Sequence, residues 1–227
     1  YALNASGDGV WDWDVPSSKV WYSKQLQTML GYTDGEFSNS LDEWSSRVHP
    51  DDRESVMNEL QLHLDGKTDG YTSEHRIRCE TGRYKWVRDS GLVIKRDENG
   101  KPLRVVGTHA DITVHKEADE KLKLANTVFT HAYEGILVTD ADSKIIEVNE
   151  AFTRITGYSR ADVIGQSPKI LQSGNHPPEF YEEMWHLIRT EGYWSGELSN
   201  RHKNGQLFVE MLTISEIRDE DGNAVNY

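Results

Sequence analysis

The pattern of apolar and polar residues along the chain predicts helices and strands in a recurring order. In residues 175–192, Pro177 and Pro178 suit a helix start and Gly192 suits a helix end. Between them runs an apolar stripe with helical spacing, formed by Phe180, Met184, Leu187 and Ile188. Residues 194–202 alternate instead, and one side carries Trp194, Gly196, Leu198, Asn200 and His202. Such alternation predicts a strand with one buried face.

A hairpin and a short helix are expected just before these elements, in residues 134–157. Two apolar runs flank the turn signal at 140–143, which favours a pair of strands. Asn149 is suited to cap a helix that ends near Gly157. The resulting order of two strands, helices and three strands predicts an α+β fold. We expect a five-stranded antiparallel sheet with its helices on one face and a cavity between the two layers.

The same pattern occurs twice in the chain. Gly31 and Tyr32 align with Gly157 and Tyr158, with similar residues on both sides. Further along, residues 71–82 align with 194–205, and the turn sequence DENG at 97–100 aligns with DEDG at 219–222. Three matching blocks in the same order indicate two copies of one domain.

Residues 115–132, between the two copies, predict an amphipathic helix. Its apolar positions recur at alternating steps of four and three, and they are Ala118, Leu122, Ala125, Phe129 and Ala132. This seam either packs on its own domain or pairs with the same helix of a second chain, which would make the protein a homodimer. In both cases the connection is a stiff helix rather than a flexible tether.

Composition narrows the range of partners. The 227 residues include 25 Lys and Arg against 38 Asp and Glu, a formal charge of −13. Nucleic acid and anionic membrane surfaces attract basic patches, so we expect neither as a partner. No apolar run is long enough to span a bilayer, and the single cysteine, Cys79, suits a reducing compartment. We expect a cytoplasmic fragment, with a membrane anchor elsewhere in the parent protein left open.

No set of residues in the sequence predicts catalysis or metal binding. The nine histidines are scattered, and no nucleophile has an evident base partner. Residues 49–52 combine an imidazole with two carboxylates, but they precede a helical segment. Acidic residues are favourable at a helix start because they lie at the positive end of the helix dipole. We therefore expect no metal and no enzymatic activity in this chain.

Both copies resemble the PAS family of small sensor domains. In the first copy the resemblance rests on GVWDWD, WSSRVHPDDR, EHRIRCETGRYKWV and VVGTHADIT. It implies that Asp111, Ile112 and Thr113 lie where the sheet passes into the exit helix and relay the signal. We expect a PAS domain at 1–114 without most of its leading helix, and a linker helix at 115–132. A second PAS domain is expected at 133–227, without most of its last strand.

The second copy is similar to PAS domains that bind a flavin. Its run WSGELSNRHKNG implies that Trp194 and Asn200 would hold the ring of FAD or FMN through stacking and amide hydrogen bonds. The alternative, which we favour, is that both residues close a core without a cofactor. The first copy has Tyr71 and Ile77 at these positions, so we expect its interior to be filled by its own side chains.

Two other cofactor chemistries fit the second copy poorly. Related light sensors that form a flavin–cysteine bond carry a cysteine in the helical segment that here reads Ser167, Pro168 and Lys169. Haem would need an axial histidine on the helix that faces the cavity. His176 and His186 lie in or beside that helix, and we expect both to be solvated.

The resemblance implies the sensory region of a bacterial signalling protein. Such a region detects a small ligand, a redox change or a partner, and it passes the change through a helix to an effector domain in the same chain. The expected effectors are cyclic-di-GMP synthases or phosphodiesterases (GGDEF or EAL domains) and histidine kinases. The alternative is an assembly module that dimerises and binds no small molecule.

Overall fold

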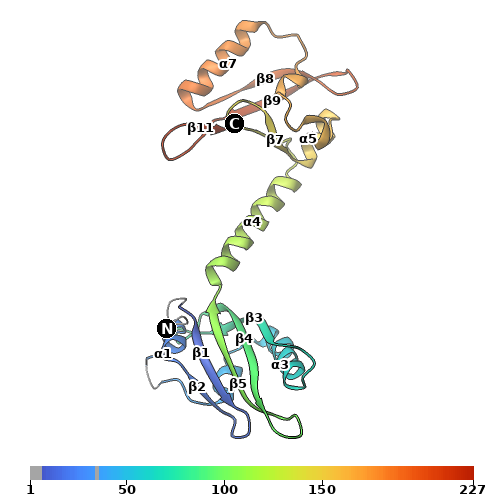
Figure 1. The fold of residues 1–227 in the computed structure, drawn as a ribbon. Helices are drawn as coiled ribbons and strands as arrows, with labels where there is room; N and C mark the ends of the chain where they lie inside the picture. The colour runs from blue at the N-terminus through green and yellow to red at the C-terminus, as the bar shows by residue number, and fades with distance from the viewer. Residues whose placement is uncertain (1–6, 34–35) are drawn as a thin grey trace. The chain divides into compact units, whose positions relative to one another are not determined.

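The computed structural model describes residues 7–33 and 36–227. The remnant of a leading helix that the alignment suggests at residues 1–6 lies outside this part of the chain. Contacts divide the chain into two compact units, Tyr1–Lys121 and Leu122–Tyr227, as the sequence repeat predicts. In the chain, helix α4 (Thr113–His131) links the last strand of the first unit to the first strand of the second (Figure 1).

The first unit is built on a five-stranded antiparallel sheet. Its strands are β1 (Gly9–Asp14), β2 (Lys19–Tyr22), β3 (Tyr71–Arg78), β4 (Tyr84–Arg96) and β5 (Pro102–Asp111). Their spatial order is β2-β1-β5-β4-β3, so strands from the two ends of the domain pair in its middle. Burial alternates along β3, where the buried positions are Tyr71, Ser73, His75 and Ile77. The predicted α+β architecture is confirmed in this unit.

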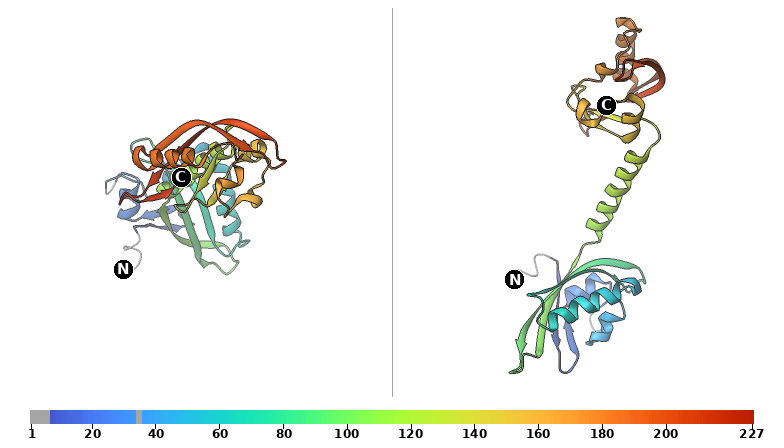
Figure 2. Two further views of the ribbon diagram at one scale, coloured as in Figure 1. Left: turned by 90° about the horizontal axis from the view of Figure 1, so that it is seen from above. Right: turned by 90° about the vertical axis from the view of Figure 1, so that its right-hand side faces the viewer.

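Three helices pack against this sheet, and the right-hand view of Figure 2 shows α3 across one of its faces. They are α1 (Lys24–Met29), α2 (Leu41–Ser45) and α3 (Pro50–Leu64). His49 caps α3, and Asp51 and Asp52 occupy its first turn, so residues 49–52 form a helix start as predicted. Asp52 also pairs with Arg76 of β3 at 2.6 Å, which ties α3 to the edge of the sheet.

The second unit has the same order of elements, with a shorter first strand and a shorter last strand. Its strands are β6 (Leu137–Thr139), β7 (Ile145–Val148), β8 (Tyr193–Arg201), β9 (Leu207–Ser215), β10 (Ile217–Arg218) and β11 (Ala224–Asn226). Its helices are α5 (Glu150–Thr156), α6 (Arg160–Val163), the 3-10 helix η1 (Pro168–Leu171) and α7 (Pro178–Glu191).

The helices predicted in the second unit are confirmed. Asn149 caps α5 by accepting a backbone N–H of the first turn, and the helix ends at Gly157 with φ 75°. α7 ends at Gly192 with φ 83°, and Met184 and Ile188 of the predicted stripe are buried. Glycine is favoured at both ends because a Cβ atom strains the left-handed conformation.

The sheet of the second unit consists of three two-stranded ladders, β6–β7, β8–β9 and β10–β11. β10 follows β9 in the chain, and an isolated bridge between Asp140 and Asn226 places β11 beside the end of β6. Thr139 and Tyr227 exchange backbone hydrogen bonds at the same point. The strand order is therefore the same as in the first unit, but the middle strand has 3 residues where β5 has 10.

Aligned residues of the two units occupy the same structural settings. Ile77 and Asn200 each form an isolated antiparallel bridge to the segment that precedes α3 or α7. Asp97 and Asp219 each close a turn in which the side chain accepts two backbone N–H bonds. The two copies inferred from the sequence are thus two versions of one fold.

None of the residues of α4, all of which the structure describes, is buried. Within residues 7–33 and 36–227, no helix combines the length and the apolar character that crossing a membrane requires.

Candidate ligand and signal-transfer sites

Asp111, Ile112 and Thr113 lie at the joint between β5 and α4, where the sequence places the signal relay. Asp111 accepts a hydrogen bond from the Thr113 N–H at 3.0 Å and pairs with the Lys85 ammonium at 2.9 Å. The same ammonium donates to the Met29 carbonyl at 2.8 Å. The joint is therefore connected both to β4 and to the end of α1.

The carboxyl group of Asp111 is held in its charged form. Partial burial would raise its pKa, but hydrogen bonds from Thr113 and Lys85 outweigh burial, and the pKa lies below its ordinary value. A depressed carboxyl pKa means that the group stabilises the fold above its unfolded pKa. This contribution is lost as the pH falls through the lower, folded pKa.

A second set of contacts holds the first turn of α4 against the sheet. Lys116 pairs with Glu74 of β3 at 2.7 Å, and its ammonium lies 5.1 Å from the centre of the Trp86 ring. The backbone N–H of Trp86 donates to the Thr113 hydroxyl at 3.1 Å, and the backbone N–H of Ile112 donates to the Trp86 carbonyl. The sequence did not predict these contacts, because the residues meet only through the pairing of β4 with both β3 and β5.

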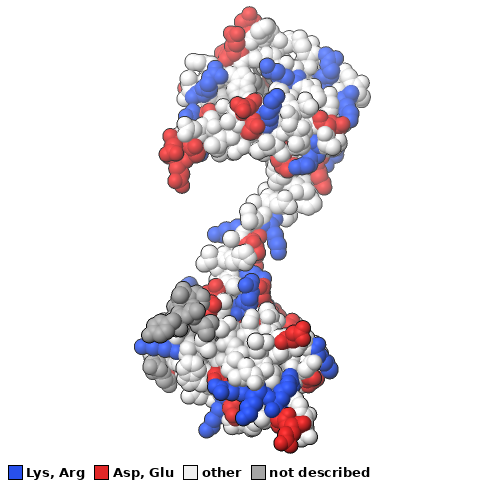
Figure 3. Space-filling view, viewed as in Figure 1, with Lys and Arg blue, Asp and Glu red and all other residues white. Residues whose placement is uncertain are grey.

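The seam predicted on α4 lies largely at the surface. Ala118, Leu122 and Ala125 are exposed, and Phe129 is half-buried. Val114 is 81% exposed and lies four residues before Ala118, so it extends the same stripe. Figure 3 shows uncharged side chains along this helix beside charged ones. An exposed apolar stripe of this kind is typical of a helix that pairs with another helix.

In the second unit, Trp194 and Asn200 lie on the inward face of β8. Asn200 is 3% exposed, and its Nδ2 donates to Oε1 of Glu210 on β9 at 2.7 Å. The Trp194 ring lies over Gly196 and packs edge-on against Phe180 of α7, with ring centres 5.9 Å apart. The amide already has a partner within the protein, and the indole is part of the packing between β8 and α7.

Glu210 adds a carboxyl group to this face that the sequence interpretation did not single out. Burial raises its pKa, and the hydrogen bond from Asn200 offsets part of the increase. A ligand bound through the Asn200 amide would have to share or replace this hydrogen bond.

His176 is not the solvated residue that the sequence predicts. It is half-buried and stacked on Phe180 with ring centres 4.2 Å apart, and its Nε2 accepts the Ser199 N–H at 2.9 Å. The nitrogen that would bind a haem iron is therefore engaged in a structural hydrogen bond. His186 is exposed, as expected.

The first unit contains a buried polar cluster that the sequence interpretation missed. At its centre is Asp89 of β4, which is 2% exposed. Its carboxylate accepts hydrogen bonds from the Trp11 indole N–H at 2.8 Å and from the Tyr71 hydroxyl at 3.4 Å, and it pairs with the His109 Nε2 at 3.0 Å. Three strands besides β4 thus contribute a partner to one buried carboxylate.

Strand register explains how this cluster forms. Asp89 stands directly opposite His109 in the β4–β5 pair. A Cβ atom at Gly91 would lie 2.6 Å from the Trp11 ring, so the indole occupies room left by the glycine. The turn at residues 97–100 is the sequence signal that could have revealed the pair, because counting outward from a hairpin turn identifies facing residues.

Several buried polar atoms around this cluster lack a hydrogen-bond partner. Among the described residues they include the indole N–H groups of Trp13 and Trp44, both ring nitrogens of His75, and Nδ1 of His109. Burial lowers the pKa of His75 to about 4, so its ring is neutral at physiological pH. In the described part of the chain, no three His, Cys, Asp or Glu side chains are placed to hold a metal ion.

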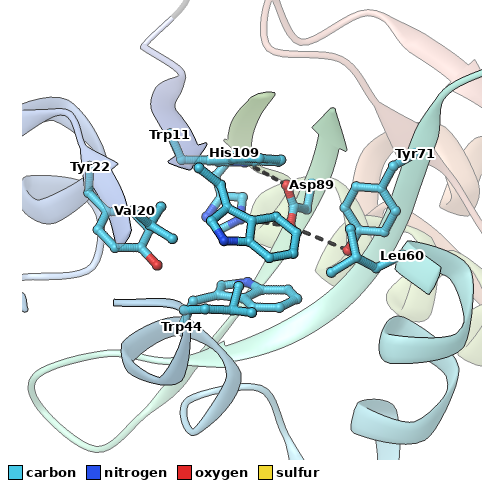
Figure 4. Close-up of a pocket in the computed structure, with 10 residues that line it drawn as sticks. Trp11, Val20, Tyr22, Trp44, Leu60, Tyr71, Asp89 and His109 are labelled. Carbon is cyan, nitrogen blue, oxygen red and sulfur yellow. Dashed lines mark hydrogen bonds and ion pairs between the residues drawn. The ribbon is translucent and has the colours of Figure 1, made fainter. Parts of the chain in front are cut away.

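A cavity of about 20 Å³ lies between the helices and the sheet of this unit, lined in part by Trp13, Trp44, Asp89 and His109. In Figure 4, the rings of Trp11 and Trp44 lie on opposite sides, with Asp89 and His109 between them. The interior is filled largely by its own side chains, as expected. What the sequence did not predict is that several of those side chains carry polar groups without partners.

Two family profiles match the chain. A profile described as the PAS fold matches residues 19–109, and one described as a PAS domain matches residues 134–227. The two matches fall on separate units, one in each.

The proteins and solved structures with similarity to the chain include a regulatory protein, a photoreceptor and a sensory box histidine kinase/response regulator. The nitrogen fixation regulatory protein of Klebsiella oxytoca is 36% identical over 101 residues, which is 44% of this chain and 20% of that protein. A blue-light photoreceptor of Listeria innocua is 34% identical over 90 residues, 38% of this chain and 36% of that protein. A sensory box histidine kinase/response regulator from Burkholderia thailandensis gives a TM-score of 0.50 at 29% identity, covering 56% of this chain and 92% of that chain. The chain spans about a fifth of the first of these proteins and about a third of the second.

Proposed function

Because the chain belongs to the PAS family, as two PAS domains in tandem, we propose that it is a sensory and regulatory region without catalytic activity of its own. A ligand, a redox change or a partner alters the first unit, and the joint at Asp111 passes the change to α4. The observation that supports this proposal is the set of contacts at the start of α4. Lys85 and Asp111 connect it to β4 and α1, and Lys116 connects it to β3.

The mechanism requires that the stimulus favours one arrangement of the joint over another. Asp111 is suited to this role because it holds three parts of the unit in one hydrogen-bonded group. A shift of β5 along β4 would change the distance between Asp111 and Lys85, and the first turn of α4 would move with it.

The proposal is tested in the full-length protein with Asp111→Ala. The output activity is compared in the light and in the dark, and with and without oxygen, and the variant is expected to lose its response. Glu120→Ala is the matched control, because it removes an exposed carboxylate from α4, the helix that follows Asp111. A variant that retains the normal response, with an unchanged melting temperature, would overturn the relay role of Asp111.

The effector controlled by this region is proposed to be a histidine kinase or a cyclic-di-GMP synthase or phosphodiesterase domain in the same chain. The likeness to a sensory box histidine kinase/response regulator supports the kinase type. Phosphate transfer in the full-length protein, measured beside cyclic-di-GMP turnover, distinguishes these effectors.

A second candidate function is flavin binding by the second unit. It is favoured by the inward placement of Trp194 and Asn200, and by similarity to a protein named as a blue-light photoreceptor. FAD or FMN would stack on the indole, and its ring edge would take the amide hydrogen bond that Glu210 receives here. The absorption spectrum of the purified full-length protein tests this. No flavin bands, and none after reconstitution, would leave both interiors without this cofactor.

The α4 stripe favours an assembly function, in which two chains pair as a homodimer through Ala118, Leu122, Ala125 and Phe129. Sedimentation of the chain with Leu122→Glu is expected to show monomers, because a carboxylate in such a seam is unfavourable. Lys121→Glu changes a neighbouring residue outside the seam and is the control. If dimers persist in the Leu122 variant, α4 is not the dimer interface.

A further inference from the structure

We propose that the interior of the first unit binds a compact, uncharged organic molecule that accepts hydrogen bonds, of the amide class, between Trp44, Trp13 and His109. This inference rests on the proposed sensory function, because it names the class of ligand to which that unit responds.

The unpartnered groups define what such a ligand must offer. The indole nitrogens of Trp13 and Trp44 can only donate hydrogen bonds, and both residues line the cavity at 6% and 5% exposure. A buried donor without an acceptor is unfavourable. A carbonyl oxygen placed between the two indoles would accept the hydrogen bonds that their N–H groups do not make within the protein. When His109 donates through Nε2 to Asp89, its Nδ1 is left as an acceptor that an amide N–H can satisfy.

The charges around the cavity favour an uncharged ligand. Asp89 is the one carboxylate among the described residues that line the cavity, and an anion beside it would be repelled in an environment of low polarity. The aromatic faces would attract a cation, but Asp89 already has three hydrogen-bonding partners. A cation would have to displace one of these partners, and the positive edges of Trp13 and Trp44 would still lack an acceptor.

The size of the cavity sets an upper limit on the ligand. A cavity of about 20 Å³ exceeds the space of roughly 10–15 Å³ that one ordered water needs, so it admits a ligand with only a few non-hydrogen atoms. A flavin or a haem is far larger than this space. The chemistry therefore differs in kind from the cofactor proposed for the second unit.

The site is connected to α4 through strand β5. His109 lies on β5, two residues before Asp111, and it contacts Asp89 on β4 at 3.0 Å. A ligand that bonds to Nδ1 of His109 acts on the same strand pair that Lys85 and Asp111 hold at the joint. Binding in the interior is thus connected to α4 through one strand.

The test uses three molecules of nearly the same shape and different charge: formamide, formate and formamidinium. Each is titrated into the full 227-residue chain, and the indole N–H signals of its seven tryptophans are followed by ¹H–¹⁵N NMR. Formamide is expected to shift the Trp13 and Trp44 signals saturably, while Trp185 and Trp194 of the second unit serve as internal controls. Formate and formamidinium are expected to leave all of these signals unchanged at the same concentrations.

Trp44→Phe is expected to weaken formamide binding about fivefold, because it removes one hydrogen-bond donor and keeps an aromatic ring. Trp21→Phe, at an exposed position of the same sheet, should leave the affinity unchanged. The proposal is overturned if formamide gives no saturable shift at Trp13 and Trp44, or if either charged molecule binds as well. It is also overturned if Trp44→Phe has no effect on the formamide affinity.

Failure of this inference is distinguishable from failure of the sensory function. Saturable binding of formamide together with a normal response in Asp111→Ala would keep the site and reject the relay. A lost response in Asp111→Ala without formamide binding would keep the relay and reject the site.

Discussion

The two units have the same strand order, but their interiors use polar groups in opposite ways. In the second unit, Asn200 donates to Glu210 on the neighbouring strand, so the two polar side chains satisfy each other. In the first unit, Asp89 has three partners, whereas the indole groups of Trp13 and Trp44 beside it have none. The second unit, whose Trp194 and Asn200 resemble a flavin site, therefore satisfies its buried polar side chains more completely than the first.

This difference in unsatisfied buried groups is the basis of the ligand site that we propose in the first unit. Among the described residues, eight of the nine buried polar side-chain atoms without a partner belong to the first unit. Such atoms are uncommon in folded proteins because each one has given up its hydrogen bonds to water without replacement. The same comparison can be tested by changing matched positions in the two units.

The largest expected difference is between Ile77→Ala and Asn200→Ala, at aligned positions of β3 and β8. Ile77 is fully buried, so its loss should reduce the free energy of unfolding of the first unit by about 4 kcal/mol. Asn200→Ala removes the donor to half-buried Glu210 and should cost about 1–2 kcal/mol. Hydrogen exchange of β3–β5 and β8–β9 amides reports each unit separately. Equal costs would contradict the contrast between an apolar and a polar position.

The next comparison concerns the glycines beneath the two inward tryptophans. A Cβ atom at Gly107 would overlap the Ser90 carbonyl and the Trp11 ring, and Gly107→Ala should destabilise the first unit by about 3 kcal/mol. At Gly196 the Cβ would lie 2.7 Å from the Trp194 ring alone, and Gly196→Ala should cost about 1 kcal/mol because that ring is only half-buried. Urea denaturation of both variants measures the two costs. A larger effect at Gly196 would show that the first sheet is less tightly packed than described.

His75 gives the first unit a pH effect that the second unit does not share. The pKa of His75 is lowered to about 4 by burial, partly opposed by Asp89 and reinforced by His109. The unfolded chain therefore binds more protons than the folded one between about pH 4 and pH 6.5, and stability falls as the pH falls through this range. The loss should be about 2 kcal/mol from pH 7 to pH 5.

The His75→Phe variant isolates this contribution, because its stability should change less over the same pH range. Exchange of β8–β9 amides provides an internal contrast. The second unit has buried Leu198 in place of His75, and the raised pKa of Glu210 should make its stability rise, not fall, as the pH falls. An identical pH dependence in His75→Phe and the wild-type chain would assign the effect to other groups.

The smallest expected effect is at the two ends of α4. Asp111→Asn keeps the size of the side chain and removes its charge, and it should cost less than about 1 kcal/mol because the side chain is 33% exposed. Asn149→Ala should cost about 1–2 kcal/mol, since Asn149 caps α5 and donates to the Phe129 carbonyl at 3.0 Å. Thermal unfolding of both variants tests this order. A larger loss in Asp111→Asn would make Asp111 a structural residue more than a relay.

Much of the fold could be predicted from the sequence, and the reason is local. Asn149 and Gly157 mark the two ends of α5, and Gly192 marks the end of α7, because capping and left-handed glycine depend on a few neighbouring residues. Strict alternation likewise predicts which face of β8 turns inward, and the placement of Trp194 and Asn200 agrees with it.

The candidate sites were predicted less completely. Asp111, Ile112 and Thr113 were placed correctly at the end of the sheet, but neither Lys85, which pairs with Asp111, nor the Lys116–Glu74 pair was identified. His176 was expected in solvent, and it instead accepts a hydrogen bond from the N–H of Ser199 on β8, 23 residues later in the chain. Each missing or incorrect assignment involves a partner from another element of the fold.

The sequence by itself determined the order of strands and helices, their ends, and the presence of two copies, because these follow from periodicity and turn chemistry within short stretches. Only the tertiary structure decided which polar groups found partners. The register of β4 with β5 places Asp89 opposite His109, and the pairing of β8 with β9 brings Asn200 next to Glu210. Register brings together residues that are distant in the chain, and whether a buried group is satisfied depends on what stands opposite it.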